Sequence, residues 1–190
     1  MRFTVGSIAL TFLILCSGCA TYPPGARKPH QPSPAAANPP VPYWKGDNFA
    51  GPTMITISLG EQRAYLHKGK ELVGVSTISS GKKDHETPPG HYRVIQKDIN
   101  HRSNLYGEYV GADGEVLKRN VDVNKDPMPE GATFLGAPMR YFLRFTGGYG
   151  MHAGYLPGYR ASHGCVRMPA SMARHFYEAA EIGTPVVVTE

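Results

Sequence analysis

The chain has 190 residues, of which 41% are hydrophobic and 18% are charged, and its formal net charge is +5. A chain of this length can bury one sizeable core, so we expect one main domain once the N-terminal segment is set aside. The lysines and arginines are scattered, without a basic run or an aromatic-interleaved basic stripe, so nucleic acid is not expected as a partner. The mild positive charge suits an anionic polymer or a membrane surface, and it equally suits a plain solubilising surface.

Residues 1–18 have the pattern of a secretory signal of the lipoprotein type. Arg2 precedes an apolar run over residues 5–15 that is too short to span a bilayer. In Ser17-Gly18-Cys19 the small residue before the cysteine resembles a lipoprotein processing site, and Ala20 resembles the outer-membrane sorting pattern. Ordinary cleavage near Ala20 without a lipid is the competing interpretation. We therefore expect an exported, periplasmic protein, anchored as an outer-membrane lipoprotein of a Gram-negative-type envelope.

Processing at Cys19 would leave one free thiol in the mature chain. Cys16 would depart with the signal and Cys19 would carry the lipid, so Cys165 would have no partner for an intramolecular disulfide. Residues 19–48 are rich in proline and cannot pack a core, which predicts an extended linker. The main domain is therefore expected over residues 49–190.

From residue 53 onward the sequence predicts short strands separated by turns. Ile55, Ile57 and Leu59 alternate as the buried face of a strand over residues 54–59. The other predicted strands cover residues 63–67, 72–78, 92–96, 109–117 with a turn at 111–114, 140–145 and 185–189. The polar stretch 98–131 is interpreted as partly a loop on the substrate side or as a variable insertion.

One helix is predicted, over residues 169–182. Pro169 suits its first turn, and Gly183 suits its C-terminal cap. The apolar stripe of this helix consists of Met172, Phe176, Ala179 and Ala180. Together these patterns predict a mainly β fold with one helix near the C-terminus.

Residues 151–168 place Cys165 beside two histidines, several glycines and an arginine. His152 lies 13 residues before the cysteine, and His163 lies two residues before it. A free thiol titrates near ~8.5, so an imidazole or backbone amides are needed to raise the thiolate fraction at neutral pH. A cysteine alone is more often a small buried hydrophobe, and this setting reverses that expectation.

Zinc is the competing interpretation of His152, His163 and Cys165. A structural zinc site requires four ligands at recurrent spacing, and no second Cys/His cluster lies nearby in the sequence. We therefore expect no metal and no other cofactor.

The pattern resembles the L,D-transpeptidase, or YkuD-like, catalytic domain family of bacterial cell-wall enzymes. The family's mark is a histidine followed by a small residue, a loop, and then Ser-x-Gly-Cys-(Ile/Val)-Arg-(Met/Leu). His152-Ala153 and the run from Ser162 to Met168 match it in order. Residues 61–66 and Thr87-Pro88-Pro89-Gly90 also look like the family's opening strands and turn. Ala153 stands where glycine is usual, and the loop before Ser162 is shorter than in many members.

The resemblance implies a YkuD-like β-sandwich or open barrel and a role for each motif residue. Cys165 is the implied nucleophile and His152 the acid/base, oriented by the carbonyl of Ala153. Gly164 and the neighbouring amides are expected to stabilise the oxyanion, with Ser162 and His163 as supporting groups. Arg167 is expected to hold a substrate carboxylate or to lock the cysteine loop, and Tyr155 to line the substrate groove.

The implied activity is transfer between peptidoglycan stem peptides through a thioester, which forms 3-3 cross-links or attaches other amine acceptors. The membrane would be reached through the lipid anchor, and the oligomeric state is left open. One alternative is an amidase or carboxypeptidase of the same fold, with water as the acceptor. The other is a catalytically retired peptidoglycan-binding lipoprotein.

Overall fold

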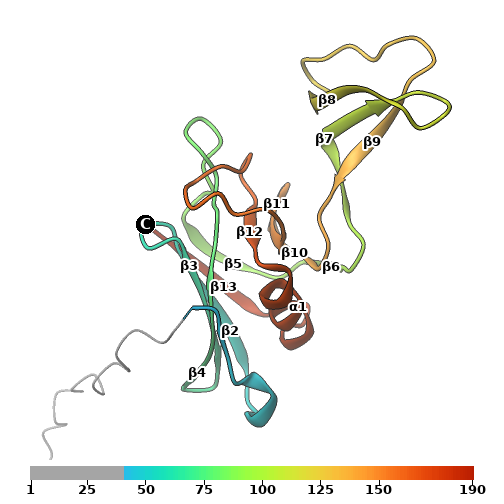
Figure 1. Cartoon of the computed structure of the whole chain (residues 1–190). Coiled ribbons are helices and arrows are strands. Elements are labelled where there is room, and N and C mark those ends of the chain that lie inside the picture. Colours follow the sequence, from blue (N-terminus) through green and yellow to red (C-terminus); the bar gives the residue numbers. More distant parts are fainter. Residues whose placement is uncertain (1–40) are drawn as a thin grey trace, which may run out of the picture. The chain divides into compact units, whose positions relative to one another are not determined.

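Three β-sheets and one α-helix make up residues 41–190, the part of the chain that the computed structural model describes (Figure 1). The predicted signal segment, Cys19 and most of the predicted linker lie outside the described residues. Residues 41–48 belong to the same compact unit as the rest of the described chain. No helix among the described residues is long and apolar enough to cross a membrane.

The largest sheet has six strands in the order β1-β4-β3-β2-β13-β5. Its strands are β1 (Tyr43–Trp44), β2 (Thr53–Ser58), β3 (Arg63–Lys68), β4 (Glu71–Thr77), β5 (Gly90–Arg93) and β13 (Pro185–Thr189). The C-terminal strand β13 pairs in parallel with β2 and antiparallel with β5. The predicted strands at 54–59, 63–67, 72–78 and 185–189 are confirmed within a residue or two at each end.

A four-stranded sheet in the order β12-β11-β10-β6 faces the helix α1 (Ala170–Ala179). Its strands are β6 (Gln96–Asp98), β10 (Phe142–Thr146), β11 (Tyr149–Ala153) and β12 (Val166–Met168). The core joins buried residues of both sheets and of the helix, such as Ile55, Leu143, Met151 and Phe176. This mainly β architecture with one helix confirms the predicted fold class.

The predicted strand over residues 92–96 is wrong, because the chain changes sheets there. The amide of Val94 donates to Thr184 O beside β13, and the amide of Ile95 donates to Arg144 O on β10, each at 2.8 Å. Successive amides thus bond to different sheets. Strand β5 ends at Arg93 and β6 begins at Gln96.

The polar stretch 98–131, interpreted as partly a loop on the substrate side or as a variable insertion, is strand over about half of its length. Strands β7 (Arg102–Val110), β8 (Val116–Asp122) and β9 (Thr133–Pro138) form a third sheet in the order β8-β7-β9. The predicted turn is present, with the amide of Gly111 donating to Glu115 O at 2.8 Å. Figure 1 shows this sheet extending beyond β6 and β10. Few of its residues are buried, so its strands lack the alternation of apolar and polar residues by which a strand is recognised in a sequence.

Helix α1 is shorter than predicted and ends differently. Pro169 precedes the first helical residue, and the amide of Ala180 donates to Phe176 O at the end of the helix. Gly183, with a φ of 91°, lies in the following turn into β13, so its prediction as the helix cap is wrong. The buried face of the helix carries Met172, Ala173 and Phe176.

The start of the described chain packs on this helix. Strand β1 pairs with β4, and the 3-10 helix η1 (Gly46–Asn48) follows it. The Trp44 ring stacks on His175 with centroids 4.5 Å apart. A Cβ atom at Gly74 would lie 2.8 Å from the Trp44 ring, so this contact requires a glycine in β4.

Candidate active site

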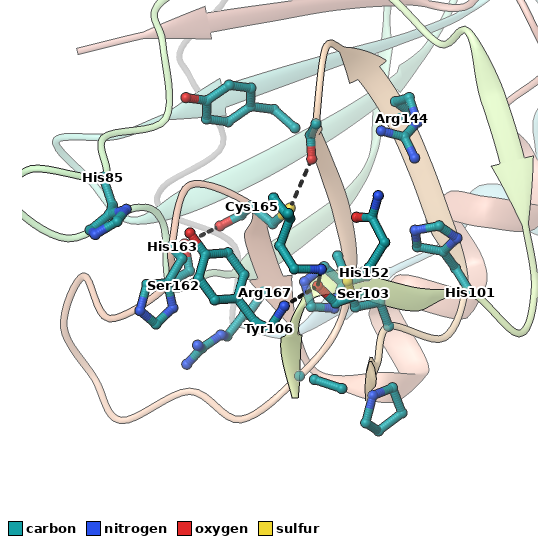
Figure 2. Close-up of a pocket in the computed structure, with 18 of the residues that line it drawn as sticks. His85, His101, Ser103, Tyr106, Arg144, His152, Ser162, His163, Cys165 and Arg167 are labelled. Atoms are coloured by element: carbon teal, nitrogen blue, oxygen red, sulfur yellow. Dashed lines mark hydrogen bonds between the residues drawn. The ribbon is translucent and has the colours of Figure 1, made fainter. Parts of the chain in front are cut away.

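A cavity of about 690 Å³ lies where the cysteine motif meets the four-stranded sheet and the β7-β8-β9 sheet (Figure 2). Its lining includes six of the predicted site residues, namely His152, Tyr155, Ser162, His163, Cys165 and Arg167. Gly164 and Ala153 lie beside them in the chain. The structure therefore brings the predicted site residues together around one cavity.

Parallel pairing of β11 with β12 brings the two halves of the motif together. His152 lies opposite Arg167 in the register, and Met151 lies opposite Val166. Cys165 directly precedes β12, so a residue 13 positions away in sequence becomes a neighbour of the histidine strand. The buried Val166 and Met168 fix this edge in the core.

One ring nitrogen of His152 lies in a hydrogen bond, and the other makes none within residues 41–190. Its Nδ1 lies 2.8 Å from Ala153 O. A carbonyl oxygen only accepts hydrogen bonds, so Nδ1 carries the proton and Nε2 keeps a lone pair. Only 7% of His152 is exposed, and burial lowers its pKa to about 4. At neutral pH this side chain is therefore an uncharged base.

Cys165 is a neutral thiol in the resting site. Burial raises the pKa of Cys165 above its usual value, against smaller opposing effects of a hydrogen bond with Gly150 and of the charges of Arg144 and Arg167. The thiol donates weakly to Gly148 O at 3.5 Å. The expectation that the site raises the thiolate fraction is wrong for the resting state, because the desolvation of the sulfur outweighs the nearby positive charges.

Ser162 and Gly164 shape the turn that presents Cys165. The Ser162 hydroxyl donates to Cys165 O and accepts the amide of Gly164 at 3.0 Å. Gly164 has a φ of 115°, and a Cβ atom there would lie 2.6 Å from the Tyr149 ring. The turn therefore requires glycine for both its conformation and its close contact.

The amide of Cys165 is the free donor at this turn. Because the amide of Gly164 already bonds Ser162, it offers no donor to an oxyanion, which corrects the expectation for Gly164. The Cys165 amide makes no hydrogen bond to any residue in the described part of the chain. Gly164 acts through the shape of the turn.

His163 packs against aromatic neighbours on one side of the cavity. The Tyr106 ring of β7 stacks on it with centroids 4.3 Å apart, and the His85 ring contacts it edge-on at 4.9 Å. Partial desolvation and the charge of Lys82 lower the pKa of His163. Within residues 41–190, no hydrogen bond joins His163 to Cys165.

Arg167 and Tyr155 lie at the wall and the rim of the cavity. Arg167 is partly buried, which lowers the pKa of its guanidinium, and no carboxylate of the described chain forms an ion pair with it. Its stem packs against Gly154, where a Cβ atom would lie 3.0 Å from Arg167 Cγ. Tyr155 is 79% exposed.

The segment before β5 holds the cysteine turn in place, and sequence reasoning assigned it no role. Thr87 is 1% exposed, and its hydroxyl donates to Gly164 O at 2.7 Å and accepts the amide of Gly81 at 3.0 Å. Ser79 exchanges backbone hydrogen bonds with Arg167, each of 3.0 Å. The one sequence feature that pointed to this segment was the resemblance of residues 87–90 to the family's opening turn.

Two further groups of the cavity, His101 and Arg144, were given no role by the sequence analysis. Both line the cavity, on the same side of Cys165 (Figure 2). Among residues 41–190, no group of three or more His, Cys, Asp or Glu side chains is arranged to hold a metal ion.

The chain is similar to several proteins that are named L,D-transpeptidases. YqjB of Bacillus subtilis (strain 168), named as a candidate L,D-transpeptidase, is 25% identical over 156 residues, which cover 78% of this chain and 79% of that protein. The L,D-transpeptidase from Mycobacterium smegmatis has a TM-score of 0.54 at 16% identity, covering 73% of this chain and 58% of that chain. A cysteine-to-serine mutant of the Enterococcus faecium L,D-transpeptidase has a TM-score of 0.53 at 25% identity, covering 74% of this chain and 50% of that chain.

The protein spans 58% of the length of the first of these solved chains and 50% of the second. The family model of the L,D-transpeptidase catalytic domain (YkuD) matches residues 52–188. This match extends from β2 to β13 and includes the whole cavity. The protein belongs to the L,D-transpeptidase catalytic domain (YkuD) family.

Proposed function

We propose that the protein is a cysteine L,D-transpeptidase that acts on peptidoglycan stem peptides in cell-wall biogenesis and remodelling, without a cofactor. The observation that carries this proposal is that a thiol, Cys165, and a neutral histidine, His152, line the same cavity, and that His152 Nε2 makes no hydrogen bond within residues 41–190. Such a pair can generate a thiolate at the moment of attack and return the proton to a leaving amine.

In the first half-reaction Cys165 takes the acyl group of a tetrapeptide stem. The thiol proton passes to His152 Nε2, and the sulfur attacks the carbonyl of the L-centre at the third position. The bond to the terminal D-alanine breaks, and His152 returns the proton to that leaving amine. The Cys165 amide would donate to the oxyanion, a contribution of ~3 kcal/mol per donor in comparable sites.

In the second half-reaction an amine from another stem peptide attacks the thioester. A new amide bond forms, the carbon–sulfur bond breaks, and the product is a 3-3 cross-link. Arg167 has no carboxylate partner in the described chain, so its guanidinium is available to a carboxylate of the substrate. The carbonyl of Ala153 keeps His152 in the reactive tautomer throughout.

Product analysis with a purified disaccharide-tetrapeptide tests the proposal. Release of D-alanine together with a cross-linked dimer is the expected result, and Cys165→Ala should give neither product. Release of D-alanine with tripeptide alone would indicate the hydrolase alternative. No release, with retention of the protein on sacculi, would indicate the retired binding protein.

We also propose that the catalytic domain is held at the outer membrane through an acylated Cys19, on the strength of the signal pattern. Cell fractionation tests this with the full-length chain. The protein is expected in the membrane fraction, and Cys19→Ser should release most of it. A fully soluble parent protein whose N-terminus lies at Ala20 or later would contradict the anchor.

A further inference from the structure

Asp98 and His101 form a hydrogen-bonded acid–imidazole pair at the edge of the cavity. Asp98 ends β6, and its Oδ2 lies 3.0 Å from His101 Nδ1. The histidine side chain is only 19% exposed. His101 belongs to the lining that also includes His152 and Cys165.

Packing holds the His101 ring in a defined orientation. The ring stacks on Phe142 with centroids 4.2 Å apart and an interplanar angle of 13°. Phe142 in turn lies 6.2 Å from the His152 ring. The backbone is fixed as well, because the amide of Met139 donates to His101 O at 2.8 Å.

This arrangement leaves His101 Nε2 as the reactive nitrogen. A carboxylate that accepts from Nδ1 fixes the tautomer in which Nε2 carries a lone pair, as an orienting aspartate does for a general base. Figure 2 shows His101 and His85 on opposite sides of Cys165, with His101 on the side of Arg144. His101 is thus a second prepared base in one cavity.

Acyl transfer to an ammonium releases two protons from its nitrogen, and one imidazole nitrogen can hold only one of them. An acceptor amine reaches the site mainly as an ammonium at neutral pH. It must lose one proton to become a nucleophile and a second proton as the amide bond forms. His152 Nε2 holds only one proton at a time, and its buried ring resists being charged.

We propose that His101, oriented by Asp98, is the base that deprotonates the acceptor amine in the second half-reaction. The ammonium gives one proton to His101 Nε2, and the resulting amine nitrogen bonds to the thioester carbon. The carbon–sulfur bond breaks, and the second nitrogen proton passes through His152 to the Cys165 thiolate. His101 then releases its proton to solvent. This inference rests on the proposed function of the same site.

The experiment measures the two half-reactions separately in the full chain. Acylation is followed as the single-turnover release of D-alanine from a disaccharide-tetrapeptide. Transfer is followed as the ratio of aminolysis to hydrolysis of the acyl-enzyme with added D-methionine. His101→Phe removes the base and keeps an aromatic ring against Phe142. Asp98→Asn keeps an acceptor oxygen for Nδ1 and removes the charge.

For His101→Phe we expect acylation within about threefold of the parent and aminolysis reduced on the order of 10²-fold or more, the usual contribution of a general base. Asp98→Asn should give a smaller loss of aminolysis. His85→Phe is the matched control, because it makes the same change on the other side of the cavity. It should leave the ratio of aminolysis to hydrolysis unchanged.

The outcomes separate this inference from the proposed function. Equal losses of acylation and aminolysis in His101→Phe would overturn the inference, and so would an unchanged ratio or the same loss in His85→Phe. A parent enzyme that is acylated and transfers the acyl group only to water would also overturn the inference, and it would identify the protein as a cysteine hydrolase. A parent that never releases D-alanine would overturn the proposed function itself.

Discussion

Cys165 and His152 are both uncharged at rest, so the ion pair of the proposed mechanism would form only during attack. Burial raises the pKa of the thiol and lowers the pKa of the imidazole to about 4. Burial disfavours both charged forms, and the same low-dielectric surroundings strengthen the attraction between them once the proton moves. The pair is therefore suited to a bound acyl donor more than to small electrophiles in solution.

The rate at which iodoacetamide alkylates Cys165 should follow the raised thiol pKa. A raised pKa means that the thiolate fraction at pH 7 is smaller than in a free thiol of ~8.5, so the rate should be low there and should keep rising beyond pH 9. The measurement is the alkylation rate against pH, with glutathione as the reference. A fast plateau below pH 7 would instead reveal a resting thiolate–imidazolium pair.

The two motif histidines should differ sharply when each is replaced by alanine. His152→Ala removes the base that we propose for the thiol and should lower the rate of acylation on the order of 10²- to 10⁴-fold. His163→Ala loses stacking with Tyr106 and should lower acylation much less. Single-turnover D-alanine release provides the comparison. A larger loss in His163→Ala would transfer the acid/base role to that residue.

The residues of the proposed reaction could be picked out from the sequence because they lie in one motif. Cys165 and His152 stand out by residue type and spacing alone. The pKa directions were not predictable, since they arise from burial of the two side chains in the folded protein. The Asp98–His101 pair was missed because its place at the cavity depends on the end of β6, which the sequence did not predict.

At the scale of elements, the cysteine turn depends on a segment far away in sequence. The stretch between β4 and β5 exchanges backbone hydrogen bonds with Arg167 and places Thr87 beneath Gly164. Regular elements such as β2 and β3 were predictable because their apolar residues alternate. This irregular segment has no periodic pattern, and its hydrogen bonds exist only in the folded chain.

Replacing Thr87 with valine should weaken both the fold and the site. The change leaves the amide of Gly81 without its acceptor and Gly164 O without its donor in a position that is 1% exposed. We expect a loss of about 1–3 kcal/mol in the free energy of unfolding and slower acylation. Urea denaturation measures the first quantity.

The control for that change is Thr133→Val. Thr133 lies exposed at the start of β9 and should tolerate the substitution within about 0.5 kcal/mol. Equal stability of the two variants would show that the Thr87 hydroxyl does not hold the cysteine turn.

At the scale of the whole molecule, the buried histidine links the site to stability. The pKa of His152 is lowered from 6.5 to about 4 in the folded protein, so the unfolded chain binds the proton more readily. Stability is therefore complete above pH 6.5 and falls as the pH decreases through this window. The difference in pKa corresponds to about 3 kcal/mol at most.

The free energy of unfolding should consequently depend on pH less in His152→Gln than in the parent. Denaturation in urea at several pH values between 4 and 7 provides the measurement. Parallel curves for the two proteins would mean that His152 titrates alike in the folded and unfolded states. His67, whose Nδ1 is buried without a partner among the described residues, contributes in the same direction in both proteins.

The measurement that tests the central claim most directly is the intact mass of the protein, quenched in acid during turnover of the disaccharide-tetrapeptide. We predict a species heavier by the donor minus D-alanine, mapped by proteolysis to Cys165 and absent from Cys165→Ala. The adduct should also disappear when an amine acceptor is added in excess. Turnover by the parent with no adduct on Cys165, or an equal adduct on Cys165→Ala, would contradict catalysis by this thiol.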